Sequence, residues 1–257
     1  MRALLVFVLA AGVSVPSATA QRPEVVDANG IVYRYFASHG YQFHPLANFA
    51  RLNALVSQRR SADARLLARA LVARGIPRGG ALYWEYRFPF GGPPRWTSGF
   101  AQAVAAQSLA RASNLLGDPS LARAAYRAFR AVRQSFLRPL GGGAWILEYG
   151  FSDMAVLNAQ LQSLVSLDSY AELTDAPEVH RTVALLDTAS RALLRRFDTG
   201  CWSRYSLGGG EADLHYHTYH VQLLRRLAAT RPHAIWKRTG DRWSRYLRNR
   251  SRPCTER

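Results

Sequence analysis

From residue 46 onward, apolar residues recur at three- and four-residue spacing, a pattern that predicts a succession of amphipathic helices. Breaks rich in Gly, Pro and Asp, such as Gly75-Ile76-Pro77 and Gly117-Asp118-Pro119, separate the periodic segments. Because consecutive helices are joined by short breaks, we expect about four antiparallel hairpins. The predicted helices are Leu46–Arg59, Ser61–Arg74, Ser98–Leu116, Ser120–Phe136, Ser152–Leu173, Glu178–Phe197, Tyr216–Ala229 and His233–Leu247.

Aromatic-rich segments interrupt the helical pattern. Ala81–Phe90 and Ala144–Tyr149 have strand-like composition, and the longer connections are 75–97, 138–151 and 198–213. Two helical architectures fit: an open solenoid of repeats or an α/α toroid. Because no repeat of fixed period is present, we favour an all-α fold, an incomplete α/α toroid with short aromatic-rich β insertions. The insertions would then gather at one end and line a cleft.

The N-terminus has the pattern of a secretory signal peptide. Arg2 precedes the apolar run Ala3–Val13, and Ala18-Thr19-Ala20 fits cleavage near Ala20. No later run approaches the length of a membrane span. We therefore expect an exported, soluble protein, periplasmic or extracellular, divided into a signal peptide (1–20), a lead-in (21–45), a main helical domain (46–250) and a basic tail (251–257).

The charge balance favours a polyanionic partner. The 34 basic residues against 17 acidic ones give a net charge of +17. Export argues against nucleic acid, which leaves an acidic polysaccharide or an anionic membrane surface. The basic C-terminal arm is either a polyanion-binding face or a solvated terminus. Cys201 and Cys254 could pair in an oxidising compartment, and the absence of a CxxC motif disfavours a thiolate zinc site.

Residues 214–220 concentrate three histidines and two tyrosines in seven positions. His215, His217 and His220 have spacings that can converge on a metal ion. However, no HExxH motif is present and no acidic ligand stands at a matching distance. We favour histidines that hydrogen-bond at the start of a helix, with no metal and no cofactor.

Other residues suggest proton transfer on a sugar. Glu148 beside Tyr149 pairs a carboxylate with a phenol, and desolvation in an aromatic cleft would raise the pKa of Glu148. Tyr86 and Trp96 could provide flat platforms for sugar faces, and Arg204 could pair with a substrate carboxylate. The plainer alternatives are an exposed acid between core aromatics and aromatic residues that only fill the core.

Several motifs, in the same order and at similar spacing, resemble the C-terminal helical domain of the D-glucuronyl C5-epimerases. The resemblance covers roughly residues 40–250. Its motifs are Gly40–Pro45, Trp96–Gln102, Trp145–Tyr149 with Asn158, Asp198–Gly200 with Tyr205, and Tyr216–His220.

The resemblance implies an α/α toroid that acts on glucuronate residues of a heparosan-like acidic polysaccharide. The family reaction removes the C5 hydrogen and returns a proton from the opposite face, which gives iduronate without a redox cofactor. The implied catalytic residues are Glu148, Tyr149, Tyr205 and Tyr216. We expect substrate binding by Tyr86, Trp96, Gln102, Asn158, Arg204, His217 and His220, and a second copy of the chain (a homodimer) is a candidate partner.

Two positions depart from the family pattern. Gly208 stands where the family has an arginine, and His215 stands where it usually has an acid. The vertebrate-type enzymes also carry N-terminal β domains for which this chain has no room. A polysaccharide lyase on the same scaffold, or a non-catalytic protein that binds acidic glycans, are therefore the alternatives to an epimerase.

Overall fold

The computed structural model describes residues 23–249 and Cys254. The predicted signal peptide with its cleavage site near Ala20, and the tail apart from Cys254, lie outside these residues. Within the described part, no helix is long and apolar enough to cross a membrane.

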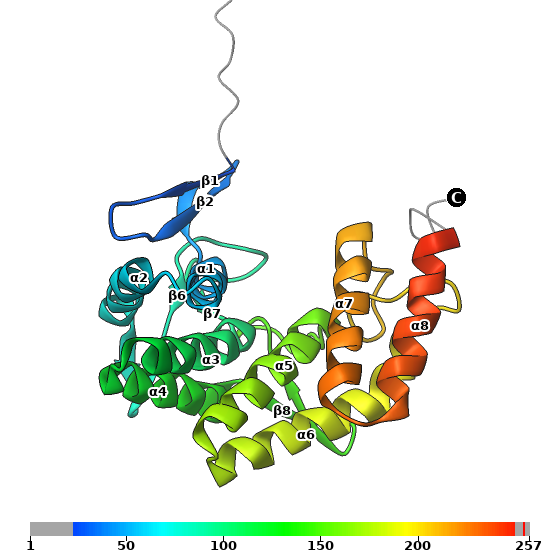
Figure 1. The fold of residues 1–257 in the computed structure, drawn as a ribbon. Coiled ribbons are helices and arrows are strands. Elements are labelled where there is room, and N and C mark those ends of the chain that lie inside the picture. Colours follow the sequence, from blue (N-terminus) through cyan, green and yellow to red (C-terminus); the bar gives the residue numbers. More distant parts are fainter. Residues whose placement is uncertain (1–22, 250–253, 255–257) are drawn as a thin grey trace, which may run out of the picture.

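The chain forms four consecutive helical pairs arranged in an open arc (Figure 1). The inner helices α1, α3, α5 and α7 pack against one another in succession, and each pairs with the outer helix that follows it. This arrangement confirms the predicted incomplete α/α toroid. The helices are α1 (Pro45–Ser57), α2 (Ser61–Arg74), α3 (Gly99–Leu116), α4 (Pro119–Ser135), α5 (Leu157–Thr174), α6 (Pro177–Leu193), α7 (Leu214–Thr230) and α8 (Ala234–Asn249), and a short 3-10 turn, Leu194–Phe197, extends α6.

Local chemistry fixes where the helices begin. Asp118 caps α4 by accepting a hydrogen bond from the Ser120 amide at 3.0 Å, and Pro119 occupies the first turn. Asp213 caps α7 in the same way, accepting from the Tyr216 amide at 2.7 Å. The predicted start of the fifth helix at Ser152 is wrong, because Val156 forms a β-bridge with Ser206 and α5 begins only at Leu157.

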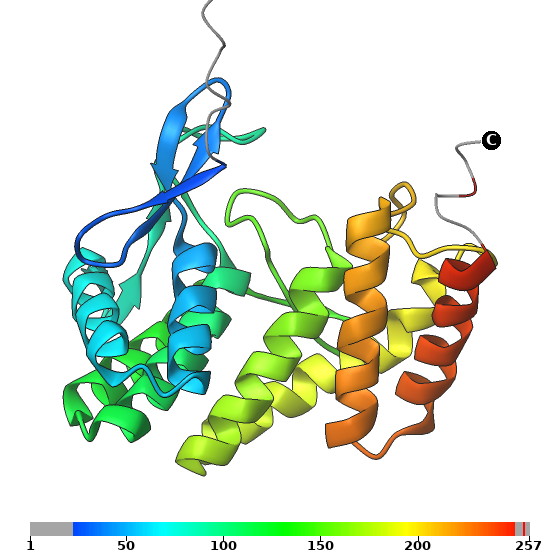
Figure 2. The same cartoon turned by 45° about the horizontal axis from the view of Figure 1, so that its top comes forward.

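Short antiparallel strands connect the helical pairs, and the N-terminal ones lie beside the first pair (Figure 2). The lead-in forms a three-stranded sheet that the sequence pattern did not predict, with strand order β1 (Glu24–Val26), β2 (Val32–Phe36), β3 (Gly40–Phe43). The two aromatic-rich segments contribute strands, as predicted. Their two-stranded sheets are β4 (Ile76–Arg78) with β5 (Ala81–Tyr83), β6 (Glu85–Tyr86) with β7 (Trp96–Thr97), and β8 (Leu137–Leu140) with β9 (Gly143–Ile146).

One large apolar core runs between the inner and outer helices, and it includes the fully buried rings of Trp84, Trp145, Trp236 and Trp243. A second, smaller cluster of Tyr86, Phe88, Trp96 and Ala101 lies beside it. Burial of this much apolar area is the main stabilising contribution to the fold. The smaller cluster is the part of the core that borders the cleft described below.

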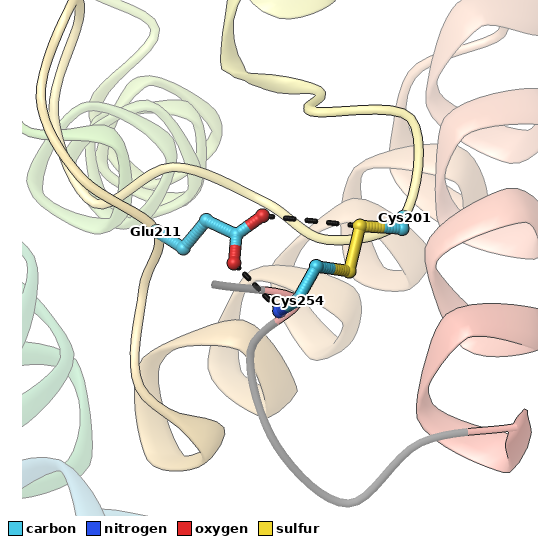
Figure 3. A group of neighbouring side chains, drawn as sticks. All are labelled: Cys201, Glu211 and Cys254. Atoms are coloured by element: carbon cyan, nitrogen blue, oxygen red, sulfur yellow. Dashed lines mark hydrogen bonds between the residues drawn. A yellow bond between two sulfur atoms is a disulfide. The ribbon is translucent and has the colours of Figure 1, made fainter. Parts of the chain in front are cut away.

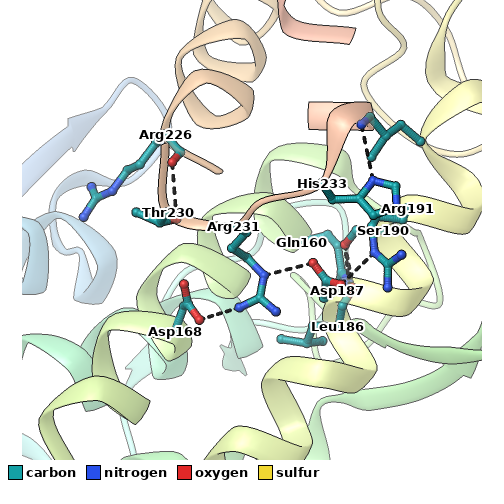
Figure 4. Close-up of polar contacts among 11 residues, drawn as sticks. Gln160, Asp168, Leu186, Asp187, Ser190, Arg191, Arg226, Thr230, Arg231 and His233 are labelled. Carbon is teal, nitrogen blue, oxygen red and sulfur yellow. Dashed lines mark hydrogen bonds and ion pairs between the residues drawn. The ribbon is translucent and has the colours of Figure 1, made fainter. Parts of the chain in front are cut away.

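Ion pairs and a disulfide connect the last helical pair and the C-terminal arm to the preceding part of the fold. Arg231, just after α7, contacts Asp168 of α5 at 2.5 Å and Asp187 of α6 at 3.0 Å (Figure 4). Cys201 and Cys254 form a disulfide with a Cα–Cα distance of 6.4 Å, and Glu211 accepts a hydrogen bond from the Cys254 amide at 2.7 Å (Figure 3). The C-terminal arm is thereby fastened to the loop between α6 and α7.

Candidate active site

A cleft of about 960 Å³ lies on the inner face of the arc. All four inner helices, the lead-in and the insertions 75–97 and 138–151 contribute to its wall. The lining combines aromatic and aliphatic side chains with polar and charged ones, which is the composition of a small-molecule or glycan site. Its polar and charged members are Arg34, His44, Asn53, Ser98, Glu148, Asn158, Gln162, His215, Thr218 and Gln222.

Glu148 follows β9 and is aimed into this cleft. The backbone of the preceding Leu147 is fixed on both sides, because its amide donates to Phe136 and its carbonyl accepts from Gly99, both at 2.9 Å. The Oε2 atom of Glu148 is buried, with no hydrogen-bond partner among the described residues. Burial raises the pKa of Glu148 to about 7, and the Tyr205 hydroxyl opposes this shift in part. The carboxyl group therefore changes protonation state near neutral pH.

Three phenols surround this carboxyl group. The Tyr149 and Tyr205 hydroxyls are 3.2 Å apart, and the Tyr205 ring packs edge-on against Tyr216 with centroids at 4.9 Å. Burial, reinforced by the nearby Glu148 charge, raises the pKa of Tyr149 to about 12 and raises the pKa of Tyr205 and Tyr216 as well. The phenols stay protonated at neutral pH and can act as hydrogen-bond or proton donors.

The structure thus brings together all four residues predicted to be catalytic, although they come from three different segments. Glu148 and Tyr149 follow β9, Tyr205 lies in the loop before α7, and Tyr216 is in the first turn of α7. Tyr205 is fixed by its backbone, which donates to the Gly210 carbonyl and accepts from the Leu157 amide, both at 3.0 Å. The first turn of α7 is held by the Asp213 cap.

An aromatic wall stands beside this cluster. The rings of Tyr86 and Trp96 stack at 4.0 Å with an interplanar angle of 5°, and Trp96 lies 5.5 Å from Tyr149. Both Tyr86 and Trp96 line the cleft, as does Asn158, whose Oδ1 atom has no hydrogen-bond partner among the described residues. These three predicted binding residues therefore lie in the wall of the cleft.

Gln102 and Arg204 do not line the cleft. Gln102 is buried, and its amide fits between the Leu82 carbonyl at 3.2 Å and the Trp84 amide at 3.0 Å, which joins α3 to the β5 segment. Arg204 donates to the Gly209 carbonyl at 2.7 Å within its own loop. Gly208 lies in this loop with φ +76°, a conformation that disfavours the arginine found there in the family.

His217 and His220 are buried behind the cleft on the far side of α7. Both Nδ1 atoms lie within hydrogen-bond distance of the Ser203 hydroxyl, at 2.7 and 2.8 Å, and the His217 ring stacks on Trp202 at 3.8 Å. Burial lowers the pKa of His217 to about 4 and that of His220 to about 3, so both rings are neutral. Their contacts are those of supports for α7.

His215 lies apart from these two histidines, in the cleft wall. Among the described residues, the one group with metal-ligand geometry is Cys201, Glu211 and Cys254, whose sulfurs are joined to each other in the disulfide (Figure 3). His217 and His220 thus share one hydrogen-bond partner, Ser203, and His215 lies apart from them.

Sequence reasoning did not select several cleft residues. Arg34 of β2 brings a positive charge to the wall, His44 lies next to it, and the Tyr219 hydroxyl donates to Gln162 at 2.9 Å. His44 stands in the Gly40–Pro45 motif, which was a usable signal. No sequence signal identified Arg34, because its position depends on the sheet that folds the lead-in back over α1.

The fold and the cleft together define a protein of the α/α toroid class with one carboxyl group and three phenols at the open end of the toroid. Residues 79–245, more than half of the chain, match the family described as the D-glucuronyl C5-epimerase C-terminus. The chain therefore belongs to this family.

Comparison with known proteins agrees with this assignment. The D-glucuronyl C5-epimerase of Caenorhabditis elegans is 27% identical over 183 residues, which cover 60% of this chain and 29% of that protein. The chain thus spans less than a third of the length of this relative. Among solved structures, cellobiose 2-epimerase from Bacillus thermoamylovorans has a TM-score of 0.65 at 8% identity, covering 88% of this chain and 66% of that one.

A family 8 glycosyl hydrolase, endoglucanase Cel10 from Klebsiella pneumoniae, has a TM-score of 0.53 at 14% identity. The similarity covers 71% of this chain and 58% of that one. At such low identity, both structural similarities support the α/α toroid fold and nothing more specific.

Proposed function

We propose that the chain is a uronate C5-epimerase, which converts glucuronate residues of an acidic, heparosan-like polysaccharide into iduronate. The observation that carries this proposal is the contrast within the cluster: one carboxyl group that titrates near pH 7 lies among phenols that stay protonated. Inversion at C5 requires a group that takes a proton from one face and a group that returns a proton to the other.

In the proposed reaction, the Glu148 carboxylate takes the C5 proton and the electron pair of the broken C–H bond moves into the substrate carboxyl group. The Tyr216 hydroxyl, which lines the same cleft and packs against the Tyr205 ring, then donates a proton to the opposite face of C5. The proton on Glu148 and the one missing from Tyr216 are exchanged through solvent before the next turnover. No redox cofactor is needed, because substrate and product are isomers.

The substrate carboxyl group must be neutralised for its α-proton to become acidic enough to leave. Arg34 and His215 line the same cleft as Glu148 and are the proposed partners of that carboxyl group. Among residues 23–249, the acid that pairs with Arg34 is Glu24, at 3.7 Å on an exposed surface, so the guanidinium of Arg34 is available. The aromatic wall of Tyr86 and Trp96 would hold the sugar face.

The test is incubation with heparosan in deuterated water, followed by analysis of deuterium at C5 and of iduronate content. Deuterium at C5 with iduronate and without unsaturated chain ends is the expected result. Ultraviolet-absorbing unsaturated ends would instead identify a lyase, which shares the first proton transfer and then eliminates at C4. Binding of heparosan with neither product would identify a non-catalytic glycan-binding protein.

Site variants make the test specific. Glu148→Gln and Tyr216→Phe each remove a proton-transfer group, and we expect C5 exchange to fall by about 10²- to 10⁴-fold. Glu172→Gln on α5 and Tyr126→Phe on α4 are the matched controls, because these side chains are exposed outside the cleft. Unchanged exchange in Glu148→Gln would show that the assignment of Glu148 is wrong.

A further inference from the structure

The inner face of the arc stays polar beyond the end of the cleft. Along the inner helices, the lining ends with Asn53 on α1, Val104 on α3, Gln162 on α5 and Gln222 on α7. Positions further along the same faces are polar or basic and accessible to solvent: Ser57 on α1, Arg111 on α3 and Arg226 on α7. The inward face of a helix in a helical protein is normally apolar, so these polar positions indicate a face that is accessible to solvent.

Arg111 is held in place at this continuation. Its Nη1 atom donates to Asn53 at 2.7 Å and its Nη2 atom donates to Ser57 at 2.9 Å. Asn53 also donates to Gln107 at 3.2 Å and itself lines the cleft. The guanidinium of Arg111 is therefore preorganised next to the cleft, with neutral partners only.

Arg226 of α7 lies near enough to Arg111 of α3 for their positive charges to interact. It lies one helical turn beyond Gln222 and is exposed. Asp168 pairs with Arg231 rather than with Arg226 (Figure 4). The positive charge of Arg226 lowers the pKa of Arg111, as burial also does. Within residues 23–249, neither arginine forms an ion pair with an acid.

We infer that Arg111 and Arg226 form a second anion subsite, which binds a carboxylate or sulfate group of the same polysaccharide chain beyond the sugar that reacts. Two neighbouring guanidiniums without a counter-charge leave donors free for an anionic oxygen, and their planar geometry suits both anions. Ten residues of α7 separate Tyr216 from Arg226, which is about 15 Å along the helix axis. The polymer would therefore run along α7, with several saccharide units between the two positions.

This inference rests on the proposed function for the identity of the polymer, but its test is a binding measurement that does not require turnover. Arg226→Gln is the variant of choice, because the Arg226 side chain makes no hydrogen bond within the described residues. Arg123→Gln, at an exposed position of the outer helix α4, removes the same charge elsewhere. Arg111 is less suitable because it also supports Asn53 and Ser57.

The affinity of wild type and both variants is measured by calorimetry with size-defined heparosan oligosaccharides, short and long, and with heparin oligosaccharides of the same lengths. We expect Arg226→Gln to weaken binding of the long oligosaccharides by about tenfold, and to leave the short ones unchanged. A greater loss with heparin would identify sulfate as the bound group. Equal losses with the two polymers would identify the carboxylate.

Three results would overturn the subsite: equal binding of long oligosaccharides by Arg226→Gln and Arg123→Gln, an equal loss for short and long oligosaccharides, or a wild type that binds neither polymer. Deuterium exchange measured in parallel separates this inference from the proposed function. If the wild type exchanges C5 deuterium and Arg226→Gln binds normally, the epimerase proposal is supported and the subsite is contradicted. If Arg226→Gln shows a length-dependent loss of binding and no protein exchanges deuterium, the subsite is supported and the epimerase proposal is contradicted.

Discussion

At the scale of single residues, burial raises the pKa of Glu148 and of the phenols around it, but the consequence at neutral pH differs between a carboxyl group and a phenol. It raises the pKa of a carboxyl group towards neutrality, and it moves that of a phenol further from neutrality. One environment therefore produces a proton acceptor and a set of proton donors. The sequence identified the residue types, and the distance of 3.2 Å between the Tyr149 and Tyr205 hydroxyls is a product of the fold.

The pH dependence of C5 exchange follows from Glu148. Its pKa is raised from 4.5 to about 7, so the carboxylate that accepts the proton forms only as pH rises through about 7. We expect the rate of deuterium incorporation at saturating substrate to increase through this range and then to level off. A rate that is already maximal two units below pH 7 would contradict the role of Glu148 as the base.

Glu148 also makes a prediction for stability. Between the unfolded pKa near 4.5 and the folded pKa near 7, only the folded state holds the proton, so this group's stabilising contribution is lost as pH rises. Relative to wild type, the free energy of unfolding of Glu148→Gln should rise by on the order of 2 kcal/mol between pH 4.5 and pH 8. Solvent on the open side of the cleft keeps this difference below the full value of the pKa shift. Urea unfolding at both pH values measures the difference, with Glu172→Gln as the control. An equal wild-type-to-variant difference at the two pH values would contradict the prediction.

At the scale of secondary-structure elements, the site depends on where the inner helices begin. Helix pairing and the aromatic insertions followed from hydrophobic periodicity and from Gly and Pro breaks. The β-bridge between Val156 and Ser206, which delays α5 to Leu157, joins segments 50 residues apart and has no local signal. The same holds for the lead-in sheet that carries Arg34 to the cleft.

The cap of α7 should matter for both stability and activity. Asp213→Ala removes the acceptor of the Tyr216 amide, which should cost about 1 kcal/mol and loosen the first turn that presents Tyr216. Asp118→Ala removes the equivalent cap of α4, away from the cleft. We expect similar losses in urea unfolding but reduced C5 exchange only for Asp213→Ala. Equal exchange in the two variants would show that the cap does not position Tyr216.

The disulfide should stabilise the last helical pair. Cys201 and Cys254 are 53 residues apart, and closing a loop of this size restricts the unfolded chain by about 4 kcal/mol in the chain-entropy account. We expect the double variant Cys201→Ser, Cys254→Ser to show a lower unfolding midpoint, and reducing agent to lower the wild-type midpoint to a similar value. A midpoint that is insensitive to reduction would contradict a stabilising role.

At the scale of the whole molecule, the concave side of the open arc carries Glu148, Tyr149 and Tyr216, and buried polar groups lie behind it. His217, His220 and Ser203 lie behind α7, while Tyr216 and His215 on the same helix face the cleft. A helix repeats every 3.6 residues, so neighbouring positions in one short motif can face a substrate and the core. The three histidines of this motif are therefore divided between the cleft and the core.

The buried histidines predict sensitivity of the whole fold to acid. Their pKa values are lowered from 6.5 to about 4 and about 3, so only the unfolded state binds these protons as pH falls below 6.5, and stability is lost on the way down. Each histidine contributes about 1.4 kcal/mol per pH unit in this window. His220→Gln should reduce the slope of the unfolding free energy against pH by about one proton. His233→Gln, which removes an exposed imidazole, is the control and should leave the slope nearly unchanged. An unchanged slope in His220→Gln would contradict the prediction.

The sequence by itself determined the features that depend on local order: the helical pairs, their breaks, the aromatic insertions, and the family to which the motifs belong. It also determined the chemical types of the site, a carboxylate and three phenols. Only the tertiary structure decided which of the selected residues face the cleft, because Gln102 and Arg204 satisfy their hydrogen bonds within the fold. It alone brought Arg34, Arg111 and Arg226 to the concave face, since contacts between segments far apart in the chain leave no trace in local hydrophobic periodicity.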